Sequence, residues 1–349
     1  MSALLNASFD PTSVPPPSDD AASFHANLDG YEATPLRQLP EIAAELDLAS
    51  VALKDESNRL GLPAFKILGA SWALDRALRN APETLTVVAA SAGNHGRAVA
   101  NAAARRGLRA RIFLPARALP ARLEAIAGEG AEVVVVDGRY EDAVARAARD
   151  GEEPGVLEIA DVGTSEAAHW VIDGYATLFD ETLEQGSFDV MLVPVGVGSL
   201  AAAAARFAAR HGLSVIGVEP VTAACLTASL AEGRPIVIDT PGSSMAGLDC
   251  AEVSPAAWPS LQSGIRGTVT VDDDAARRRR HRTRGSRPVD RAFGRRHSRR
   301  AAVARETPER RRTEDGDRPL TRLPGPLDRH RRPHRPPAAR RMTLIHPRS

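Results

Sequence analysis

The feature of this sequence that most constrains its fold is a regular alternation of short apolar runs with segments of helical period. The apolar runs carry few polar residues and occupy 86–90, 110–114, 132–136, 190–195 and 214–219; helical segments are expected at 97–106, 120–127, 140–149 and 166–183. Strands that are apolar on both faces and joined through helices are typical of a parallel sheet covered on both sides. The sequence therefore predicts an α/β fold, and 349 residues allow two sub-domains.

The two ends of the chain differ from this middle part. Residues 1–30 are rich in Pro, Ser and Asp, which predicts a loose, disordered arm. From 277 to 349 arginine crowds the sequence, large apolar residues are few, and no strand or helix period remains. Such a segment buries too little apolar surface to offset the entropy of an ordered chain, so we predict a disordered Arg/Pro-rich tail.

The composition favours a cytoplasmic protein without a membrane partner. Two cysteines form no disulfide framework, which favours a reducing compartment. The first residues lack the basic and then apolar pattern of a signal peptide. No apolar run approaches the roughly 20 residues that a membrane-spanning helix needs.

One lysine stands out because it lies inside an apolar run. Lysine occurs only at positions 54 and 66, whereas arginine supplies every other long basic side chain. Lys66 is flanked by Phe65, Ile67 and Leu68. A lysine desolvated in such surroundings has a lowered pKa, and Schiff-base chemistry needs a deprotonatable amine that arginine cannot supply. The alternative is a lysine whose ammonium group reaches water from a helix edge.

Two loops follow predicted strands at their carboxyl ends, where open α/β sheets bind ligands. Gly196-Val197-Gly198-Ser199-Leu200 joins a strand to a helix; its backbone N–H groups suit a phosphate, although a structural turn explains it equally well. Ser91-Ala92-Gly93-Asn94 offers a hydroxyl and an amide, with a plain βα turn as the alternative. The adjacent His95 is more often structural than catalytic at such a position. Together with Lys66, these loops are the parts that a pyridoxal phosphate site requires.

The ordered set of motifs resembles the tryptophan-synthase-β-like family of pyridoxal phosphate enzymes (fold type II), and within it the diaminopropionate ammonia-lyase branch. The resemblance covers about residues 30–276. It rests on Thr34-Pro35-Leu36, Lys54-Asp55-Glu56-Ser57, Gly61-Leu62-Pro63-Ala64-Phe65-Lys66, Gly93-Asn94-His95-Gly96-Arg97, Gly174-Tyr175-Ala176-Thr177-Leu178, Gly196-Val197-Gly198-Ser199-Leu200, Val218-Glu219-Pro220 and Met245-Ala246-Gly247-Leu248-Asp249-Cys250.

The resemblance implies a fold and a reaction. It implies two three-layer α/β sub-domains with mainly parallel sheets. The larger, cofactor-binding one is expected at 31–75 and 176–276, C-terminally incomplete, and the smaller at 76–175. The implied reaction is elimination from a small amino acid, diaminopropionate-like, to a 2-oxo acid and ammonia. A homodimer is implied by resemblance alone.

The resemblance also implies roles for individual residues. Lys66 is similar to the lysine that binds the cofactor as a Schiff base and moves the α-proton. Asn94 is similar to the asparagine that hydrogen-bonds the cofactor's phenolic oxygen. Gly196, Val197, Gly198, Ser199 and Leu200 match the phosphate loop, and Ser91, Ala92, Gly93 and Asn94 match the loop that holds the substrate carboxylate.

The sequence departs from the family pattern in two places. The branch usually has an acidic residue where this chain has Ala92, and Ser91-Ala92-Gly93-Asn94 is more similar to threonine/serine dehydratases, which gives the alternative function. After Ala276 nothing matches the family's last helix and strand, or its hydroxyl or thiol residue near the pyridine nitrogen. We hypothesise a reading-frame change there, which resequencing of the DNA tests. A catalytically impaired remnant, lacking one wall of the cofactor pocket, is the further alternative.

Two other classes of partner are not expected. The arginine-rich tail could attract nucleic acid electrostatically, but it has almost no aromatic residues for stacking and no docking motif. Some relatives hold a divalent metal near the position of Glu219, but the carboxylate expected a few residues later is replaced by Ala223 and Cys225. We therefore predict no metal.

Overall fold

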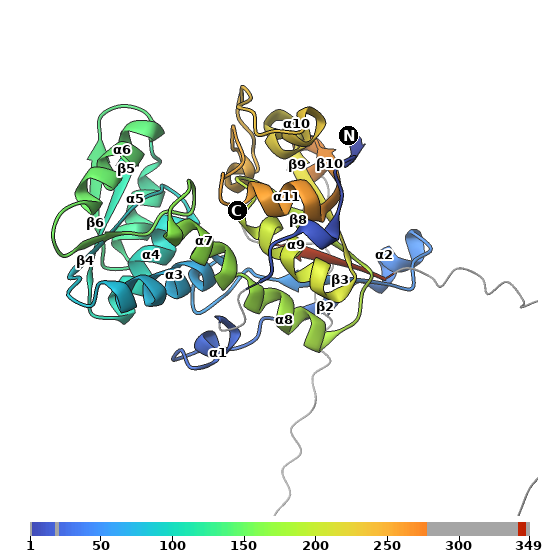
Figure 1. The fold of residues 1–349 in the computed structure, drawn as a ribbon, viewed down its shortest axis with the longest axis horizontal. Helices are drawn as coiled ribbons and strands as arrows, with labels where there is room; N and C mark the ends of the chain where they lie inside the picture. The colour runs from blue at the N-terminus through green and yellow to red at the C-terminus, as the bar shows by residue number, and fades with distance from the viewer. Residues whose placement is uncertain (1, 18–20, 278–340, 347–349) are drawn as a thin grey trace, which may run out of the picture. The chain divides into compact units, whose positions relative to one another are not determined.

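The computed structural model describes residues 2–17, 21–277 and 341–346, which form two β-sheets and their helices (Figure 1). The larger sheet has the order β1-β10-β9-β8-β11-β3-β2. Its strands are β1 (Ala3–Leu5), β2 (Leu36–Gln38), β3 (Ser50–Asp55), β8 (Val190–Pro194), β9 (Ser214–Pro220), β10 (Ile265–Val271) and β11 (Arg341–His346). The interior strands pair in parallel, whereas β1 and β2 at the edges are antiparallel to their neighbours.

The smaller sheet is parallel throughout and has the order β6-β5-β4-β7. Its strands are β4 (Thr86–Ala90), β5 (Arg109–Pro115), β6 (Glu132–Val136) and β7 (Val156–Glu158). The predicted α/β class with mainly parallel sheets is thus confirmed. The larger sheet draws its strands from 3–55, 190–271 and 341–346 and the smaller from 86–158; the sub-domain boundaries given above stay a prediction.

Helices cover the strands that the sequence placed next to them. In the smaller sheet α4 contacts β4 and β5, and α6 contacts every strand; in the larger sheet α9 contacts β8 and β9, and α10 contacts β9 and β10. The helices are α1 (Ala21–Ala26), α2 (Pro40–Glu45), α3 (Lys66–Asn80), α4 (Asn94–Arg105), α5 (Pro120–Ala127), α6 (Tyr140–Gly151), α7 (Glu166–Gly174), α8 (Ala176–Gln185), α9 (Ser199–His211), α10 (Cys225–Glu232) and α11 (Trp258–Gly264). The single helix expected at 166–183 is two helices, α7 and α8, which meet at Tyr175.

The prediction of a loose arm over residues 1–30 is wrong for the described part of that segment. Strand β1 pairs with β10, and the Asn6 side chain donates hydrogen bonds of 2.7 Å to two backbone carbonyls, those of Gln262 and Ile265. On α1, the buried His25 ring bridges Thr177 and the Leu68 carbonyl. Composition failed here because the partners that order the segment lie far along the chain.

The prediction of a disordered tail over 277–349 is wrong at 341–346. These residues form β11, which pairs in parallel with β3 on one side and β8 on the other. Thr343 and Ile345 are buried there. The described larger sheet is therefore continuous through this strand and has no edge at β8 or β3. The remainder of the predicted tail, 278–340 and 347–349, lies outside the described residues.

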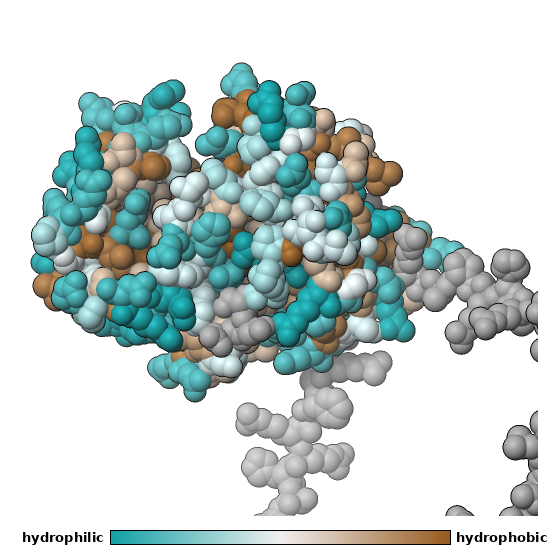
Figure 2. Space-filling view, viewed as in Figure 1, coloured by the Kyte–Doolittle hydropathy of each residue, from teal (hydrophilic) through white to brown (hydrophobic). Residues whose placement is uncertain are grey.

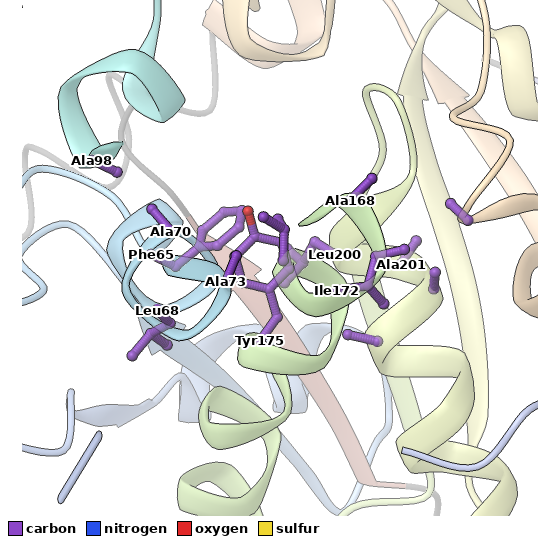
Figure 3. Packing of buried hydrophobic residues seen from close by; sticks show 14 of the residues in the cluster. Phe65, Leu68, Ala70, Ala73, Ala98, Ala168, Ile172, Tyr175, Leu200 and Ala201 are labelled. Atoms are coloured by element: carbon purple, nitrogen blue, oxygen red, sulfur yellow. The ribbon is translucent and has the colours of Figure 1, made fainter. Parts of the chain in front are cut away.

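Most buried apolar side chains of both sheets and their helices form one extended core, part of which is shown in Figure 3. A second, smaller cluster lies between α6 and the smaller sheet and contains Val88, Phe113, Ala143 and Ala147. On the face shown in Figure 2 hydrophilic side chains predominate and apolar ones are scattered. Among the residues that the structure describes, no helix has the length and apolar character needed to cross a membrane.

A buried ionic network ties α8 to β3 and the turn after it. Glu181 pairs with Lys54 at 2.7 Å and with Arg59 at 2.5 Å, and Arg59 also pairs with Glu56 at 2.6 Å. Burial raises the pKa of Glu181, but Arg59 and Lys54 outweigh it and hold that pKa below its usual value. The two cations and two anions balance, so no charge in this network is left uncompensated.

Replacing Glu181 by glutamine is expected to reduce the free energy of unfolding by about 3 kcal/mol, because Lys54 then loses its paired carboxylate and Arg59 keeps only that of Glu56. Urea denaturation measures the change. Glu184→Gln, on the exposed side of the same helix, is the control and should change stability by less than about 0.5 kcal/mol. Equal effects of the two substitutions would contradict this role of the network.

Candidate active site

Lys66 is the first residue of α3 and is directly preceded by a tight turn. Leu60 and Gly61 have φ of 52° and 83°, and Arg59 bridges to Leu62 across the turn. The helix dipole places partial positive charge at this end, which disfavours an ammonium group without a counter-ion. Asp161 supplies that counter-ion: its Oδ2 lies 2.8 Å from Lys66 Nζ, and the side chains are 22% and 13% exposed.

The expected lowering of the Lys66 pKa does not occur in this structure. Burial does act to lower it, but the charge of Asp161 outweighs burial and raises the pKa above its usual value. The sequence argument considered the apolar neighbours and did not include a carboxylate 95 residues away. For Asp161, burial acts to raise the pKa, but His95 and Lys66 hold it well below its usual range.

His95 lies on the other side of the same carboxylate. Its ring is buried and its Nε2 lies 2.9 Å from the Ile159 carbonyl; its Nδ1 lies 3.7 Å from Asp161 Oδ2, which is too far for a hydrogen bond. Because a carbonyl oxygen can only accept, Nε2 carries the proton. Burial lowers the pKa of His95, although the charge of Asp161 acts to raise it. His95 thus fixes the segment that carries Asp161.

The loop Ser91–Asn94 joins β4 to α4. The Ser91 hydroxyl accepts a hydrogen bond of 3.2 Å from the Gly93 N–H, and Asn94 begins the helix. A Cβ at Gly96 would lie 2.3 Å from the Ser91 carbonyl oxygen, so the loop folds directly onto the first turn of α4. The loop therefore presents a hydroxyl, an amide and helix N–H groups at the carboxyl end of β4.

The glycine loop joins β8 to α9 and requires both of its glycines. Gly198 has φ of +93°, and a Cβ there would lie 2.6 Å from Leu261 Cδ1. A Cβ at Gly196 would lie 3.0 Å from the Gly247 carbonyl oxygen and 3.1 Å from Cys250 Sγ. The first turn of α9 contains no acidic residue. Its N–H groups and the helix dipole are therefore free of a competing carboxylate and favour an anion.

Asp161 joins Lys66 to the glycine loop and to His95, the residue that follows the Ser91–Asn94 loop. Besides its contacts with Lys66 and His95, its carbonyl oxygen accepts a hydrogen bond of 3.2 Å from the Ser199 hydroxyl at the head of α9. Asp161 follows β7, which pairs with β4, so it emerges at the same edge of the sheet as Ser91. The sequence analysis missed Asp161 because β7 is only three residues long. Asp161 could have been found by considering the polar residues that follow each short apolar run in the sequence.

The Glu219 carboxylate binds backbone N–H groups at the start of α10. It accepts hydrogen bonds from the N–H groups of Leu226 and Thr227, at 2.7 and 2.8 Å. Within 2–17, 21–277 and 341–346, no group of three or more His, Cys, Asp or Glu side chains is arranged to hold a metal ion.

Comparison with known proteins identifies the family to which a chain with this site belongs. Residues 28–283 match the family described as pyridoxal-phosphate dependent enzyme. The chain belongs to this family. Its cofactor is pyridoxal phosphate, and the predicted fold type II is thereby confirmed.

Individual members of the family are similar over most of the chain. Diaminopropionate ammonia-lyase of Escherichia coli K12 is 32% identical over 288 residues, which cover 73% of this chain and 72% of that protein. A crystal structure of the E. coli enzyme with an aminoacrylate-PLP azomethine intermediate has a TM-score of 0.71 at 30% identity and covers 78% of this chain and 76% of that one. L-threonine dehydratase of E. coli K12 is 31% identical over 70% of this chain and 48% of its own length. The chain is therefore a pyridoxal-phosphate-dependent lyase.

The residues present fit this cofactor. Pyridoxal phosphate offers an aldehyde to an amine and a phosphate to an anion site. Lys66 is an amine that could meet the first need, and the glycine loop forms a backbone cradle, suited to the second, that a Cβ at Gly196 or Gly198 would fill. The relation of the cofactor to individual residues stays a proposal, given below.

Replacing Gly198 by alanine is expected to weaken cofactor binding about tenfold and to cost about 2 kcal/mol of stability, because the left-handed backbone is strained and Leu261 must move. Fluorescence titration with pyridoxal phosphate and urea denaturation measure the two effects. Gly212→Ala, at the other end of α9, is the matched control: its φ is +68°, but the space around it is open. It should cost about 1 kcal/mol and leave cofactor binding unchanged.

Proposed function

We propose that this chain is an ammonia-lyase that eliminates a β-substituent from a small, diaminopropionate-like amino acid and releases a 2-oxo acid and ammonia. The observation that supports it most is the contact of Lys66 with Asp161 at 2.8 Å, at a point joined to the glycine loop and to His95 after the Ser91–Asn94 loop. The similarity to diaminopropionate ammonia-lyase over 73% of the chain supports the choice of reaction.

Lys66 and Asp161 have separate roles in the proposed reaction. When bound, the cofactor supplies an electrophilic carbon for the substrate's amino group and a ring that accepts electrons. Lys66 holds the cofactor and then, as a free amine, moves the proton at Cα. Asp161 stabilises the ammonium form of Lys66 once that proton has arrived, because the carboxylate lies 2.8 Å from Nζ.

The loops bind the ends of the reacting molecules. Gly196, Val197, Gly198, Ser199 and Leu200 hold the cofactor's phosphate through backbone N–H groups at the head of α9. Ser91, Ala92, Gly93 and Asn94 hold the substrate's carboxylate at the head of α4, and Asn94 also binds the cofactor's phenolic oxygen. Both helix N-termini place positive partial charge where these anions sit.

A threonine/serine dehydratase is the second candidate, and Ala92 is the observation that favours it. The methyl group of Ala92 cannot move a proton. In this alternative, Lys66, with Asp161 as its partner, therefore moves the α-proton on one face of the substrate only. This suits an L-amino acid with a hydroxyl leaving group. The similarity to L-threonine dehydratase over 70% of the chain supports the same alternative.

The ratio of products separates the two candidates. The purified protein is supplied with pyridoxal phosphate and then with diaminopropionate, serine or threonine of either chirality. Diaminopropionate releases two molecules of ammonia for each 2-oxo acid, whereas serine and threonine release one. Turnover of diaminopropionate at the higher ratio supports the ammonia-lyase, and turnover of the hydroxy amino acids alone supports the dehydratase. Cofactor binding without turnover of any of them would contradict both.

A further inference from the structure

Tyr175 has a buried hydroxyl group for which the structure provides no partner. The residue sits at the junction of α7 and α8 and is 0% exposed, and its Oη forms no hydrogen bond within the described residues. A buried hydroxyl without a partner costs free energy, and phenylalanine would avoid that cost. Tyr175 belongs to the motif Gly174-Tyr175-Ala176-Thr177-Leu178. The presence of the hydroxyl therefore requires a reason other than packing.

Two glycines allow Tyr175 and its helix junction to pack closely against α3. A Cβ at Gly69 of α3 would lie 2.7 Å from Tyr175 Cε1 and 2.8 Å from the Val171 carbonyl oxygen. A Cβ at Gly174 would lie 2.6 Å from the Leu68 carbonyl oxygen. The two helices thus meet backbone to backbone, one turn from Lys66. The Tyr175 ring therefore packs directly on the first turn of α3.

The same packing places the ring beside the Lys66 amino group. Lys66 Nζ lies 5.9 Å from the ring centroid of Tyr175 and 5.9 Å from that of Phe65. The two rings meet edge to face, with centroids 5.0 Å apart at 81°, within the core cluster shown in Figure 3. Burial raises the pKa of Tyr175 to about 12, although the charge of Lys66 opposes it. At neutral pH the phenol therefore keeps a proton that it can donate.

We propose that Tyr175 is a positioning residue for Lys66, and that its hydroxyl is the hydrogen-bond partner of the amino group when that group leaves Asp161. The ammonium form of Lys66 has Asp161 as its partner. The neutral amine of Lys66 has a lone pair that can accept a hydrogen bond. A carboxylate cannot donate to this lone pair, whereas a phenol O–H can. The proposal deepens the proposed function and rests on Lys66 acting in its neutral form.

Other titratable groups also act on Lys66, and the test must hold them fixed. They are Asp161 after β7, Cys250 on the loop before α11, Tyr140 at the start of α6 and His95 on α4. Tyr175→Phe leaves all of them in place and removes one oxygen atom.

Three readouts on the full-length chain test the proposal. Tyr175→Phe should unfold at the same temperature as the unaltered protein or a higher one, because the lost hydroxyl had no partner. Its kcat for elimination should fall about tenfold with KM unchanged, because the hydroxyl acts on the lysine and not on the substrate. Before the cofactor is added, the pH at which Lys66 becomes reactive toward formaldehyde and cyanoborohydride, read by mass spectrometry, should rise, because the donor that favoured the neutral amine is gone.

Tyr31→Phe is the matched control, since Tyr31 donates its phenol proton to Glu181 at 2.5 Å and not to a group of the candidate site. It should lower stability and leave both kcat and the reactivity of Lys66 unchanged. Tyr175→Phe with unchanged Lys66 reactivity, or with a loss of stability as its main effect, would overturn the proposal. The lysine readout needs no turnover, so it decides the role of Tyr175 even where the unaltered protein eliminates none of the amino acids and the proposed function itself fails.

Discussion

Replacing Lys66 by arginine is expected to abolish covalent attachment of pyridoxal phosphate and to lower elimination by at least about 1,000-fold. Arginine keeps the positive charge, and it can keep an ion pair with Asp161, which lies 2.8 Å from the present amino group. It stays protonated and so can neither attack an aldehyde nor move the α-proton. The visible absorbance of the loaded protein and the release of 2-oxo acid measure the two effects.

Lys54→Arg is the control for this substitution, because Lys54 is the chain's other lysine. Its ammonium group is buried against Glu181 and the Thr34 carbonyl, not against a loop of the candidate site. The variant should bind the cofactor as the unaltered protein does. Retention of a covalent adduct in Lys66→Arg, or its loss in Lys54→Arg alone, would show that Lys66 is not the attachment point.

Replacing Asp161 by asparagine is expected to lower kcat about 100-fold while the cofactor still attaches. Asparagine has nearly the same shape, but it cannot balance the charge of an ammonium group 2.8 Å away. Because Asp161 raises the pKa of Lys66, its loss should lower that pKa. The neutral amine should then appear at lower pH, so the cofactor should attach faster at neutral pH, and the midpoint of the pH dependence of attachment should move to lower pH.

Glu158→Gln provides the matched carboxylate control, three residues earlier on β7. Burial raises the pKa of Glu158, and its carboxylate is not the partner of Lys66, which pairs with Asp161. Both kcat and the pH dependence of attachment should stay within about twofold of the unaltered protein. If Asp161→Asn left the pH dependence of attachment where it was, the ion pair would not set the protonation of Lys66.

Much of this fold could be predicted from local pattern. The apolar runs at 86–90 and 132–136 coincide with β4 and β6. In the buried strand β4 the signal is carried by its own residues, and in the partly exposed edge strand β6 by its run of valines. The glycine loop could be placed because a strand, two glycines and a helix follow one another directly.

The parts that were missed depend on partners distant in the sequence. Asp161 acquires its importance only through Lys66, His95 and Ser199, which lie on three other elements. Likewise β1 is ordered by β10, more than 250 residues later. In such cases the local sequence carries no period that predicts the pairing.

Strand β11 is the clearest example of a pairing that the local sequence does not predict, and it bears on the reading-frame hypothesis. Its six residues follow an arginine-rich stretch with no apolar period, yet they pair along β3 from Ser50 to Asp55. A frame change that continued to the end of the chain would not be expected to yield a strand that fits between β3 and β8. The hypothesis therefore stays a prediction for the part of the chain between 277 and 340, where resequencing tests it.

The most direct test of the central claim is to identify the residue that carries the cofactor. The purified protein is incubated with pyridoxal phosphate, its visible absorbance is recorded, and the complex is reduced with borohydride and mapped by mass spectrometry. With lysine only at 54 and 66, the result is unambiguous. A pyridoxyl group on Lys66, with Lys54 unmodified, is the result that the proposed site predicts. Folded protein with no visible absorbance and no pyridoxyl group on Lys66 would contradict it.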